Sequence, residues 1–260
     1  MYNNAYLQNV VHYDSNDNFL SVIRHDVLYA AFILTQFDSI KNNKTLFKIK
    51  NLSMLPEDLN LINDHLDGLV IIDKQKYTYG ICLFNKWCGF KNIIVNETIN
   101  KNKVQLISQL IYENCNKDSK LFYDTLHDLN KKLMFFISIT KHVPSIDVNE
   151  MLLMVDEDTN NLIKKIPNNH GYLSFYINEA LINKTIDNFP KDSNLYKLYR
   201  SGSRFSKSQL ARSCVNIGLV ADENNIVIQT PINSSLIFGL TAEEFFAGAS
   251  GTKTSACQKT

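Results

Sequence analysis

The sequence predicts an α+β fold that is mostly helical, and three observations lead to this prediction. Four segments, at residues 24–40, 78–90, 101–114 and 118–132, carry apolar residues in patterns typical of helices. Shorter runs of strand length, apolar or alternating, lie between or after them. With 260 residues, of which 45% are hydrophobic, the chain is long enough to bury the core of one large domain or two modest ones.

The first predicted elements are a helix at 24–40, a strand at 45–50, a first helical turn at Pro56-Glu57-Asp58 and a strand at 69–72 after an Asp67-Gly68 turn. Helices are then predicted to begin at Thr78, Lys101 and Asp118. They are followed by a strand at 134–137, a loop at 144–148 and polar helices between Asp156 and Tyr199. Proline is tolerated in a first helical turn, where its missing amide would have no partner. The helices at 101–114 and 118–132 place apolar residues on one side and charges on the other. A domain boundary is expected between 140 and 165.

The helix that opens at Asp26 has an almost continuous apolar run from Val27 to Leu34, which is too uniform for one amphipathic face. We therefore expect this helix to be buried on assembly with other chains. Large apolar patches on a water-soluble chain usually mark a partner interface. The segments at 26–37 and 78–90 are accordingly predicted to expose hydrophobic surface when the chain is alone.

The last part of the chain contains two predicted helix starts and a hairpin. Ser206 is placed to cap a helix from Lys207 to Cys214. Thr241 and Glu244 have the spacing of a capping box, in which each side chain bonds the other residue's amide. Phe245-Phe246 is predicted to anchor that helix in the core. The hairpin is predicted to have its tight turn at Asn224-Asn225 and to end at Thr230-Pro231.

Charge and composition exclude several classes of protein. A formal net charge of +1 lacks the basic excess that a free-standing nucleic-acid binder usually shows. No apolar run reaches the ~18 residues that span a bilayer, and the polar start lacks the pattern of a signal peptide, so cytoplasmic localisation is expected. Abundant Asn, Lys and Ile with only 9 Gly and 5 Pro indicate an AT-rich coding genome, viral or bacterial.

No metal site or catalytic triad is predicted from the spacing of the residues. The five cysteines, Cys82, Cys88, Cys115, Cys214 and Cys257, are scattered, and none of their spacings matches a zinc knuckle. They are predicted to be buried free thiols in a reducing compartment. Asp156-Glu157-Asp158 lies in a polar stretch without flanking glycines, which favours a solvated acidic patch over a metal site.

An ordered series of short motifs near the end of the chain is more specific. Ser201-Gly202-Ser203-Arg204 is followed by Gly218-Leu219, by Thr230-Pro231-Ile232 and by Gly239-Leu240-Thr241 with Glu244-Phe245-Phe246. This series resembles the β′ (largest) subunit of multisubunit DNA-directed RNA polymerases, where an S-G-[AS]-[RK]-G-S element precedes the bridge helix. The segments at 24–35 and 78–85 fit two further motifs of that family more loosely, with Ile81 in place of an arginine. The likeness is good at 195–254 and weak at 10–155.

The resemblance implies a domain order and a set of partners. Residues 1–150 would form a small mixed pore domain, 151–235 a helical funnel, and 236–260 the truncated start of a long bridge helix. The N-A-D-F-D-G-D loop that binds catalytic Mg²⁺ in the family is missing here, so we expect Mg²⁺ to be bound by a partner chain, as in the split β′ of giant-phage polymerases. The chain would then be inactive alone. Its partners would be β-like chains and other β′ fragments, and it would reach DNA template, RNA and nucleoside triphosphates through the assembly.

The resemblance also assigns residues to the incoming nucleoside triphosphate. Arg204 would contact its phosphates, since guanidinium is a permanently charged, bidentate donor. Gly202 would let the turn approach the ligand, Ser206 would add donors at a helix start, and Lys253 would follow at the bridge-helix opening. No residue of this chain is predicted to be catalytic. The alternatives are a solvated arginine beside a helix cap, and a polymerase-derived structural or regulatory protein without a working site. Phe205 departs from the family's glycine after the basic residue, which puts the geometry of the loop in question.

Overall fold

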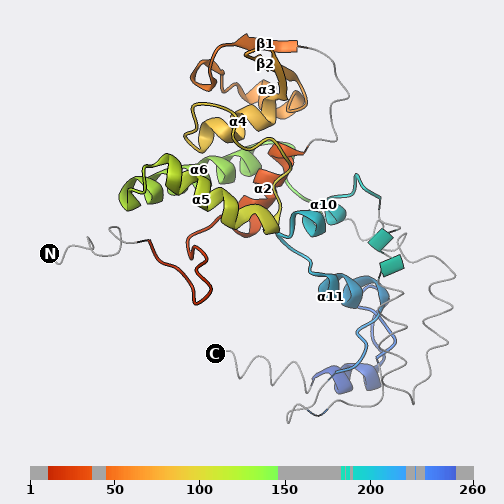
Figure 1. The fold of residues 1–260 in the computed structure, drawn as a ribbon. Coiled ribbons are helices and arrows are strands. Elements are labelled where there is room, and N and C mark those ends of the chain that lie inside the picture. Colours follow the sequence, from red (N-terminus) through yellow and green to blue (C-terminus); the bar gives the residue numbers. More distant parts are fainter. Residues whose placement is uncertain are drawn as a thin grey trace. The chain divides into compact units, whose positions relative to one another are not determined.

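The computed structural model describes residues 11–36, 45–145, 190–220 and 232–249, together with 183–184, 186–187 and 226. The chain divides into two compact units (Figure 1). Unit 1 comprises residues 1–144 with Arg200–Arg204, and unit 2 comprises 145–199 and 205–260. The described part is mostly helical with one small sheet, which confirms the predicted fold class. The predicted limits of the pore-like, funnel-like and bridge-helix regions stay predictions.

The sheet of unit 1 has three strands in the order β1-β2-β3. β1 (Thr45–Ile49) pairs in parallel with β2 (Leu69–Ile72), which pairs antiparallel with β3 (Gln75–Thr78). The hairpin turn between β2 and β3 uses Asp73 and Lys74, whose φ values of 46° and 70° suit a two-residue turn that needs positive φ at both positions. β1 and β2 confirm the predicted strands, whereas β3 was not predicted.

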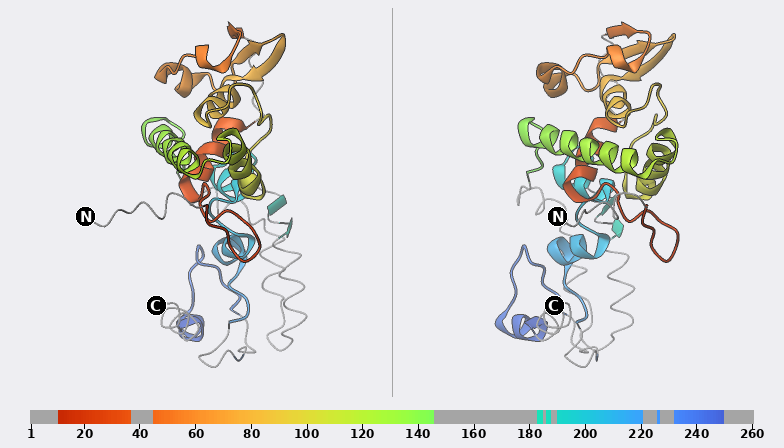
Figure 2. Two further views of the ribbon diagram at one scale, coloured as in Figure 1. Left: turned by 60° about the vertical axis from the view of Figure 1, so that its left-hand side comes forward. Right: turned by 90° about the vertical axis from the view of Figure 1, so that its left-hand side faces the viewer.

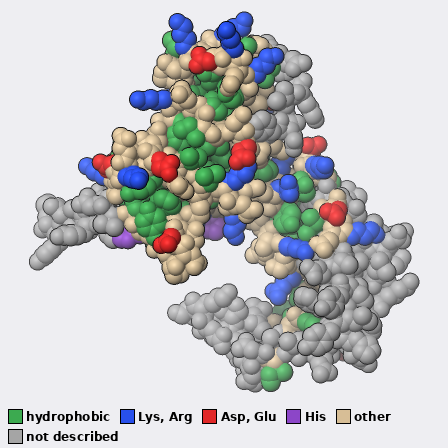
Figure 3. Space-filling view, viewed as in Figure 1, with side chains coloured by type: hydrophobic (Ala, Val, Ile, Leu, Met, Phe, Trp, Pro, Cys, Tyr) green, Lys and Arg blue, Asp and Glu red, His purple; other side chains and the backbone are tan. Residues whose placement is uncertain are grey.

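Lysines lie on both edges of this sheet. Lys48 of β1 and Lys76 of β3 flank Ile71 of the central strand in register, and both lysine side chains are exposed. Figure 3 shows Lys and Arg side chains gathered over the end of unit 1 that carries β1 and β2. Charged side chains on edge strands disfavour pairing with other strands.

Helices form most of the remaining described part of unit 1 (Figure 2). They are η2 (Leu52–Met54), α3 (Leu59–Asp64), α2 (His25–Thr35), α4 (Tyr79–Trp87), η3 (Lys101–Lys103), α5 (Val104–Asn114) and α6 (Ser119–Ile139). α2 packs against both α4 and α6. The crossing of α2 and α4 is close, because a Cβ atom added to Gly80 would lie 2.1 Å from the carbonyl oxygen of Leu34. Only glycine fits this position without moving one of the helices.

Three predictions for unit 1 were wrong. Residues 134–137 are not a strand, because α6 continues through them to Ile139 and places Phe136 and Ile137 in the core while Phe135 stays 59% exposed. Residues 56–58 precede α3 instead of opening it, since Asp58 is the N-cap and accepts bonds from the amides of Asn60 and Leu61. The apolar helices α2 and α4 are buried inside the chain's own fold, so they expose little hydrophobic surface.

The described residues of unit 2 contain short helices, one of which ends in unit 1, and a backbone bridge. α10 (Asn194–Ser201) precedes the turn at 202–204, α11 (Lys207–Leu210) continues into a π-helical turn, η4 (Ala211–Val215), and residues 242–249 form a further helix. Gly218 and Ile232 exchange two backbone hydrogen bonds of 2.9 Å, as at the base of a hairpin. The predicted turn at Asn224-Asn225 and the Thr230-Pro231 exit lie outside the described residues, as do most of the polar helices predicted after Asp156.

The helix at 242–249 begins with the predicted capping box. The Thr241 amide donates to Glu244 Oε2 at 2.9 Å, and the Glu244 amide donates to Thr241 Oγ1 at 3.2 Å. Phe245 and Phe246 are 59% and 72% exposed, so the prediction that they anchor the core was wrong. No helix in the described residues has both the length and the apolar character needed to cross a membrane.

Candidate functional site

The turn at 201–204 is built on a pair of buried hydroxyls. α10 ends at Ser201, whose Oγ lies 2.8 Å from Ser203 Oγ and accepts a 3.3 Å bond from the Ser203 amide. Both serines are buried, with exposed fractions of 0% and 7%. Buried hydroxyls are stable only when they are hydrogen-bonded, so this pair fixes the backbone that carries the next residue, Arg204.

Gly202 occupies a place that no other residue fits. Its φ of +71° is in the left-handed region, and an added Cβ atom would lie 2.6 Å from Cβ of Lys101. Glycine alone adopts this φ without a steric cost. The turn therefore packs against the stem of Lys101, the first residue of η3, a contact that was not predicted from the sequence.

Arg204 extends from this turn to an aspartate near the start of α2. Its Nε lies 3.3 Å from Asp26 Oδ1, and its Nη2 lies 3.3 Å from both carboxylate oxygens. The two side chains are about equally exposed, at 51% and 53%. Arg204 is thus half-exposed and paired with a carboxylate of unit 1. Asp26 was predicted to start a helix but was not predicted to be a site residue.

The backbone around this ion pair is unusual. Phe205 has a φ of +57° and His25 a φ of +50°, and both are non-glycine residues in the left-handed region. The glycine that the β′ motif has at the place of Phe205 would adopt this conformation freely. Phe205 thus has the left-handed backbone that a glycine adopts easily, so the bulky ring does not prevent this conformation of the loop.

The other two predicted contact residues are less informative. Ser206 caps α11, because its Oγ accepts from the Gln209 amide at 3.4 Å and its own amide donates to Gln209 Oε1 at 2.9 Å. Its Oγ also lies 3.0 Å from Ser208 Oγ. These bonds give Ser206 a structural role in unit 2. Lys253 lies outside the described residues.

The described residues do not fit a catalytic metal ion. Among them, no three His, Cys, Asp or Glu side chains come together in a group that could hold one. Asp156-Glu157-Asp158 and Cys257 are outside the described residues. Cys82, Cys88, Cys115 and Cys214 are buried free thiols, as predicted. Burial raises the pKa of Cys82 to about 12 and of Cys214 to about 11, so these sulfurs are neutral thiols rather than nucleophiles.

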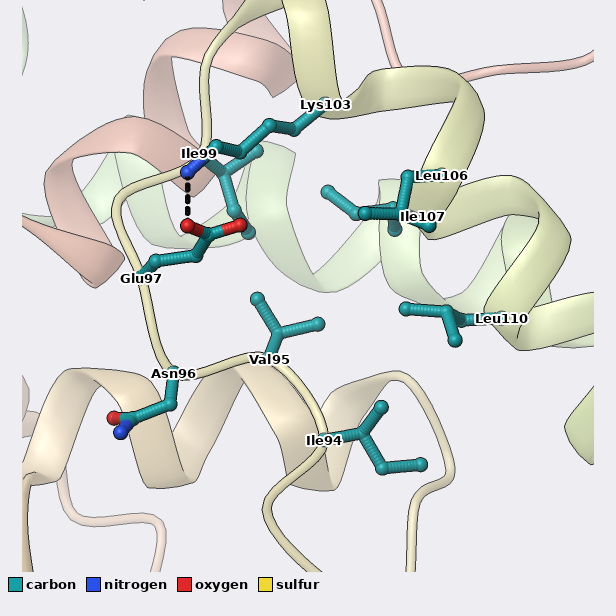
Figure 4. A pocket seen from close by; sticks show the side chains of 9 residues that line it. All are labelled: Ile94, Val95, Asn96, Glu97, Ile99, Lys103, Leu106, Ile107 and Leu110. Atoms are coloured by element: carbon teal, nitrogen blue, oxygen red, sulfur yellow. Dashed lines mark ion pairs between the residues drawn. The ribbon is translucent and has the colours of Figure 1, made fainter.

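Unit 1 also has an apolar hollow of about 220 Å³, shown in Figure 4. Side chains of α5 line one side of it and the segment 94–99 lines the other. At its edge Lys103 Nζ forms an ion pair of 2.6 Å with Glu97 Oε2, marked by the dashed line. Its lining residues are Ile94, Val95, Asn96, Glu97, Ile99, Lys103, Leu106, Ile107 and Leu110. This mostly aliphatic lining, with its one lysine already paired, does not suit a polyphosphate.

Comparison with known proteins supports the resemblance found in the sequence. No protein-family model matches the chain. The chain is 27% identical over 231 residues to a protein named DNA-directed RNA polymerase subunit β′ from Borrelia turicatae, and 25% identical over 235 residues to the β′ subunit from Borreliella burgdorferi. The subunit from Borrelia hermsii is 26% identical over 231 residues.

Each of these three matches covers 81% of this chain but only 16% of the relative's length. The matched region thus corresponds to a small part of a β′ subunit and to most of the chain described above. The chain is therefore similar over most of its length to one segment of the β′ subunit of bacterial DNA-directed RNA polymerases.

Proposed function

We propose that this chain is part of a DNA-directed RNA polymerase, in which it helps to form the channel for nucleoside triphosphates and contacts the incoming triphosphate. The observation that carries the proposal is Arg204, a half-exposed guanidinium on a turn whose backbone is fixed by Gly202 and two buried serines. The similarity to β′ subunits over 81% of the chain supports the assignment to such a polymerase.

The chemistry of the turn suits a phosphate ligand. Guanidinium keeps its charge at every physiological pH and offers two parallel N–H donors that match phosphate oxygens. The turn contributes binding and orientation only, since the described residues do not fit the metal ions of nucleotidyl transfer. In this proposal Mg²⁺ is bound by a partner chain, and the polymerase is a split type such as those of giant phages. Partner subunits, template DNA and RNA belong to the same proposal, as does a cytoplasmic location, in the host if the source is viral.

The alternative is a structural or regulatory protein derived from a polymerase subunit, without a working site. Phe205 in place of glycine and Ile81 in place of arginine are the departures that favour it. Both are accommodated: Phe205 keeps a left-handed φ of +57°, and Ile81 is fully buried in α4. Neither departure removes the charged group that the proposal needs.

The test is Arg204→Ala in the polymerase assembled with this chain. A charge-assisted hydrogen bond to phosphate contributes about 1.5–3 kcal/mol, and each ~1.4 kcal/mol is tenfold, so kcat/KM for nucleotides should fall roughly ten- to a hundredfold. Arg204→Lys should restore part of the loss, because the charge remains while the bidentate geometry is lost. Lys207→Ala is the control, and it should have little effect.

Two results would count against the proposal. If Arg204→Ala leaves the nucleotide dependence of elongation unchanged, the arginine is a surface residue. If the variant prevents assembly, and Arg204→Lys does so too, its role is structural. Co-purification of the tagged chain with polymerase subunits is the prior requirement, and isolation of the chain without them would favour the alternative.

A further inference from the structure

We propose that Asp26 is a positioning residue for Arg204, and that it turns one edge of the guanidinium toward the triphosphate. This inference rests on the proposed function and names a residue that the motif around Arg204 does not contain. Asp26 lies 178 positions away in the sequence, near the start of α2.

The hydrogen bonds define which edge is used. Nε and Nη2 form the side edge of the guanidinium, and both donate to the Asp26 carboxylate. Arginine has five N–H donors in a fixed plane. The end edge, made by Nη1 and the second N–H of Nη2, has no acceptor among the described residues. Asp26 therefore fixes the plane of the group and leaves two parallel donors for an anion.

The backbone conformation at both ends of the ion pair supports a role in function. His25 precedes Asp26 and Phe205 follows Arg204, with φ values of +50° and +57°. Non-glycine residues pay an energetic penalty in this region, and such residues cluster at binding and active sites. Gly202, at +71°, adds a third left-handed residue on the arginine side of the pair.

Stability alone does not explain the pair. At about half exposure and 3.3 Å, an ion pair adds little to folding, because solvent screens the charges and two side chains are immobilised. The same immobilisation favours ligand binding, because a guanidinium that is already oriented loses less conformational entropy when the ligand binds. The pair is thus more useful for positioning Arg204 than for holding the fold.

The experiment measures nucleotide use by the assembled polymerase with Asp26→Ala and Asp26→Asn. Loss of a side chain's preorganisation should raise KM about three- to tenfold while kcat stays within about twofold. Asp26→Asn should stay close to the wild type, because its amide oxygen still accepts from Nε and Nη2. If the carboxylate acted by repelling the triphosphate, both variants would lower KM, which would overturn the proposal.

A double-mutant cycle with Arg204→Ala shows whether Asp26 acts through the arginine. In the Arg204→Ala background, Asp26→Ala should cause no further change in KM. Asp64→Ala is the matched control, because Asp64 also forms an exposed ion pair in unit 1. Its Oδ1 lies 2.6 Å from Lys141 Nζ. It should leave KM unchanged.

The outcomes separate this inference from the proposed function. If Arg204→Ala has no effect on nucleotide use, the proposed function fails. If Arg204→Ala has its effect but Asp26→Ala does not, only the positioning role fails. A readout without nucleotide is the Arg204 Nε–H signal in an NMR spectrum of the isolated full chain. It should be resolved in the wild type and Asp26→Asn, and should broaden or exchange rapidly in Asp26→Ala. An unchanged signal in Asp26→Ala would also contradict the proposal.

Discussion

The amide side chain of Asn85 should be essential to the stability of unit 1. Asn85 is completely buried in α4, and all its hydrogen-bonding groups have partners. Its Nδ2 donates to the carbonyl oxygens of Ile81 at 2.9 Å and Val95 at 2.7 Å. Its Oδ1 accepts from the amides of Ile94 and Val95, both at 2.9 Å. One side chain thus attaches the segment after α4 to the helix.

The size of the effect follows from what Asn85→Ala leaves behind. The N–H and C=O of Val95 would lose their partner in a buried place, and an unsatisfied buried group costs about 1–3 kcal/mol. The Ile94 amide is only partly buried and can bond water instead. We therefore expect the free energy of unfolding of unit 1 to fall by about 3–5 kcal/mol, which includes the small cavity left by the side chain.

The assay is urea denaturation of the full chain followed by tryptophan fluorescence. Trp87 is the single tryptophan of the sequence, lies at the end of α4 and is 6% exposed, so its signal reports on unit 1. Asn114→Ala is the control, because Asn114 makes one exposed bond of 3.3 Å to the Gly89 carbonyl and should cost less than about 1 kcal/mol. If Asn85→Ala lowers the free energy of unfolding by no more than this control, the reasoning is wrong.

Two further predictions concern ionisable groups. Burial raises the pKa of the Cys82, Cys88 and Cys214 thiols, so at pH 7 a thiol-specific reagent should label them more than about tenfold more slowly in the folded chain than in urea, as followed by mass spectrometry. Rapid labelling of Cys88 in the folded chain would contradict its burial. Burial alone would raise the pKa of Glu244, but hydrogen bonds from Thr241 and Ser234 outweigh this effect and lower it below the ordinary 4.5. Its contribution to stability is therefore complete above pH 4.5 and is lost as the pH falls through the lowered folded value, so hydrogen exchange at 242–249 should show protection that falls as the pH is lowered below 4.5 in the wild type but not in Glu244→Gln.

Local signals in the sequence predicted the parts of the fold that depend on local rules. The helix predicted to begin at Thr78 formed, with Thr78 itself as its N-cap. The capping box of Thr241 and Glu244 formed as its spacing predicted. The segment at 78–85 was predicted to begin a helix and to fit a loose motif, and the structure shows what two of its residues do. Gly80 allows the close approach of α2, and Asn85 binds the segment at 94–95.

The errors arise where tertiary context decides between two local possibilities. An apolar run such as 134–137 suits a strand or a buried helix, and only the continuation of α6 settles which. The uniformly apolar α2 suits a partner interface or the centre of the chain's own fold, and here α4 and α6 cover it. β3 has the polar sequence of an edge strand, which carries a weak local signal.

The contact between Asp26 and Arg204 could not be predicted from either segment by itself. An aspartate in the first turn of a helix has a sufficient local explanation, since negative charge is favourable there. An arginine before a capped helix is equally unremarkable. Their relation depends on a fold that brings residues 178 positions apart to one place.

The distribution of buried and exposed groups at the turn distinguishes a binding arginine from a structural one. A structural arginine is expected to bury its donors against several acceptors, because removing a partner from a buried charge is costly. At 201–204 the arrangement is the reverse. The fixed parts are the buried hydroxyls of Ser201 and Ser203 and the backbone of Gly202, whereas the guanidinium is half-exposed and, among the residues that the structure describes, bonded to Asp26 through one edge only. The stabilising contacts of this turn thus fix the backbone that carries Arg204, and the charge of the guanidinium remains available to a ligand.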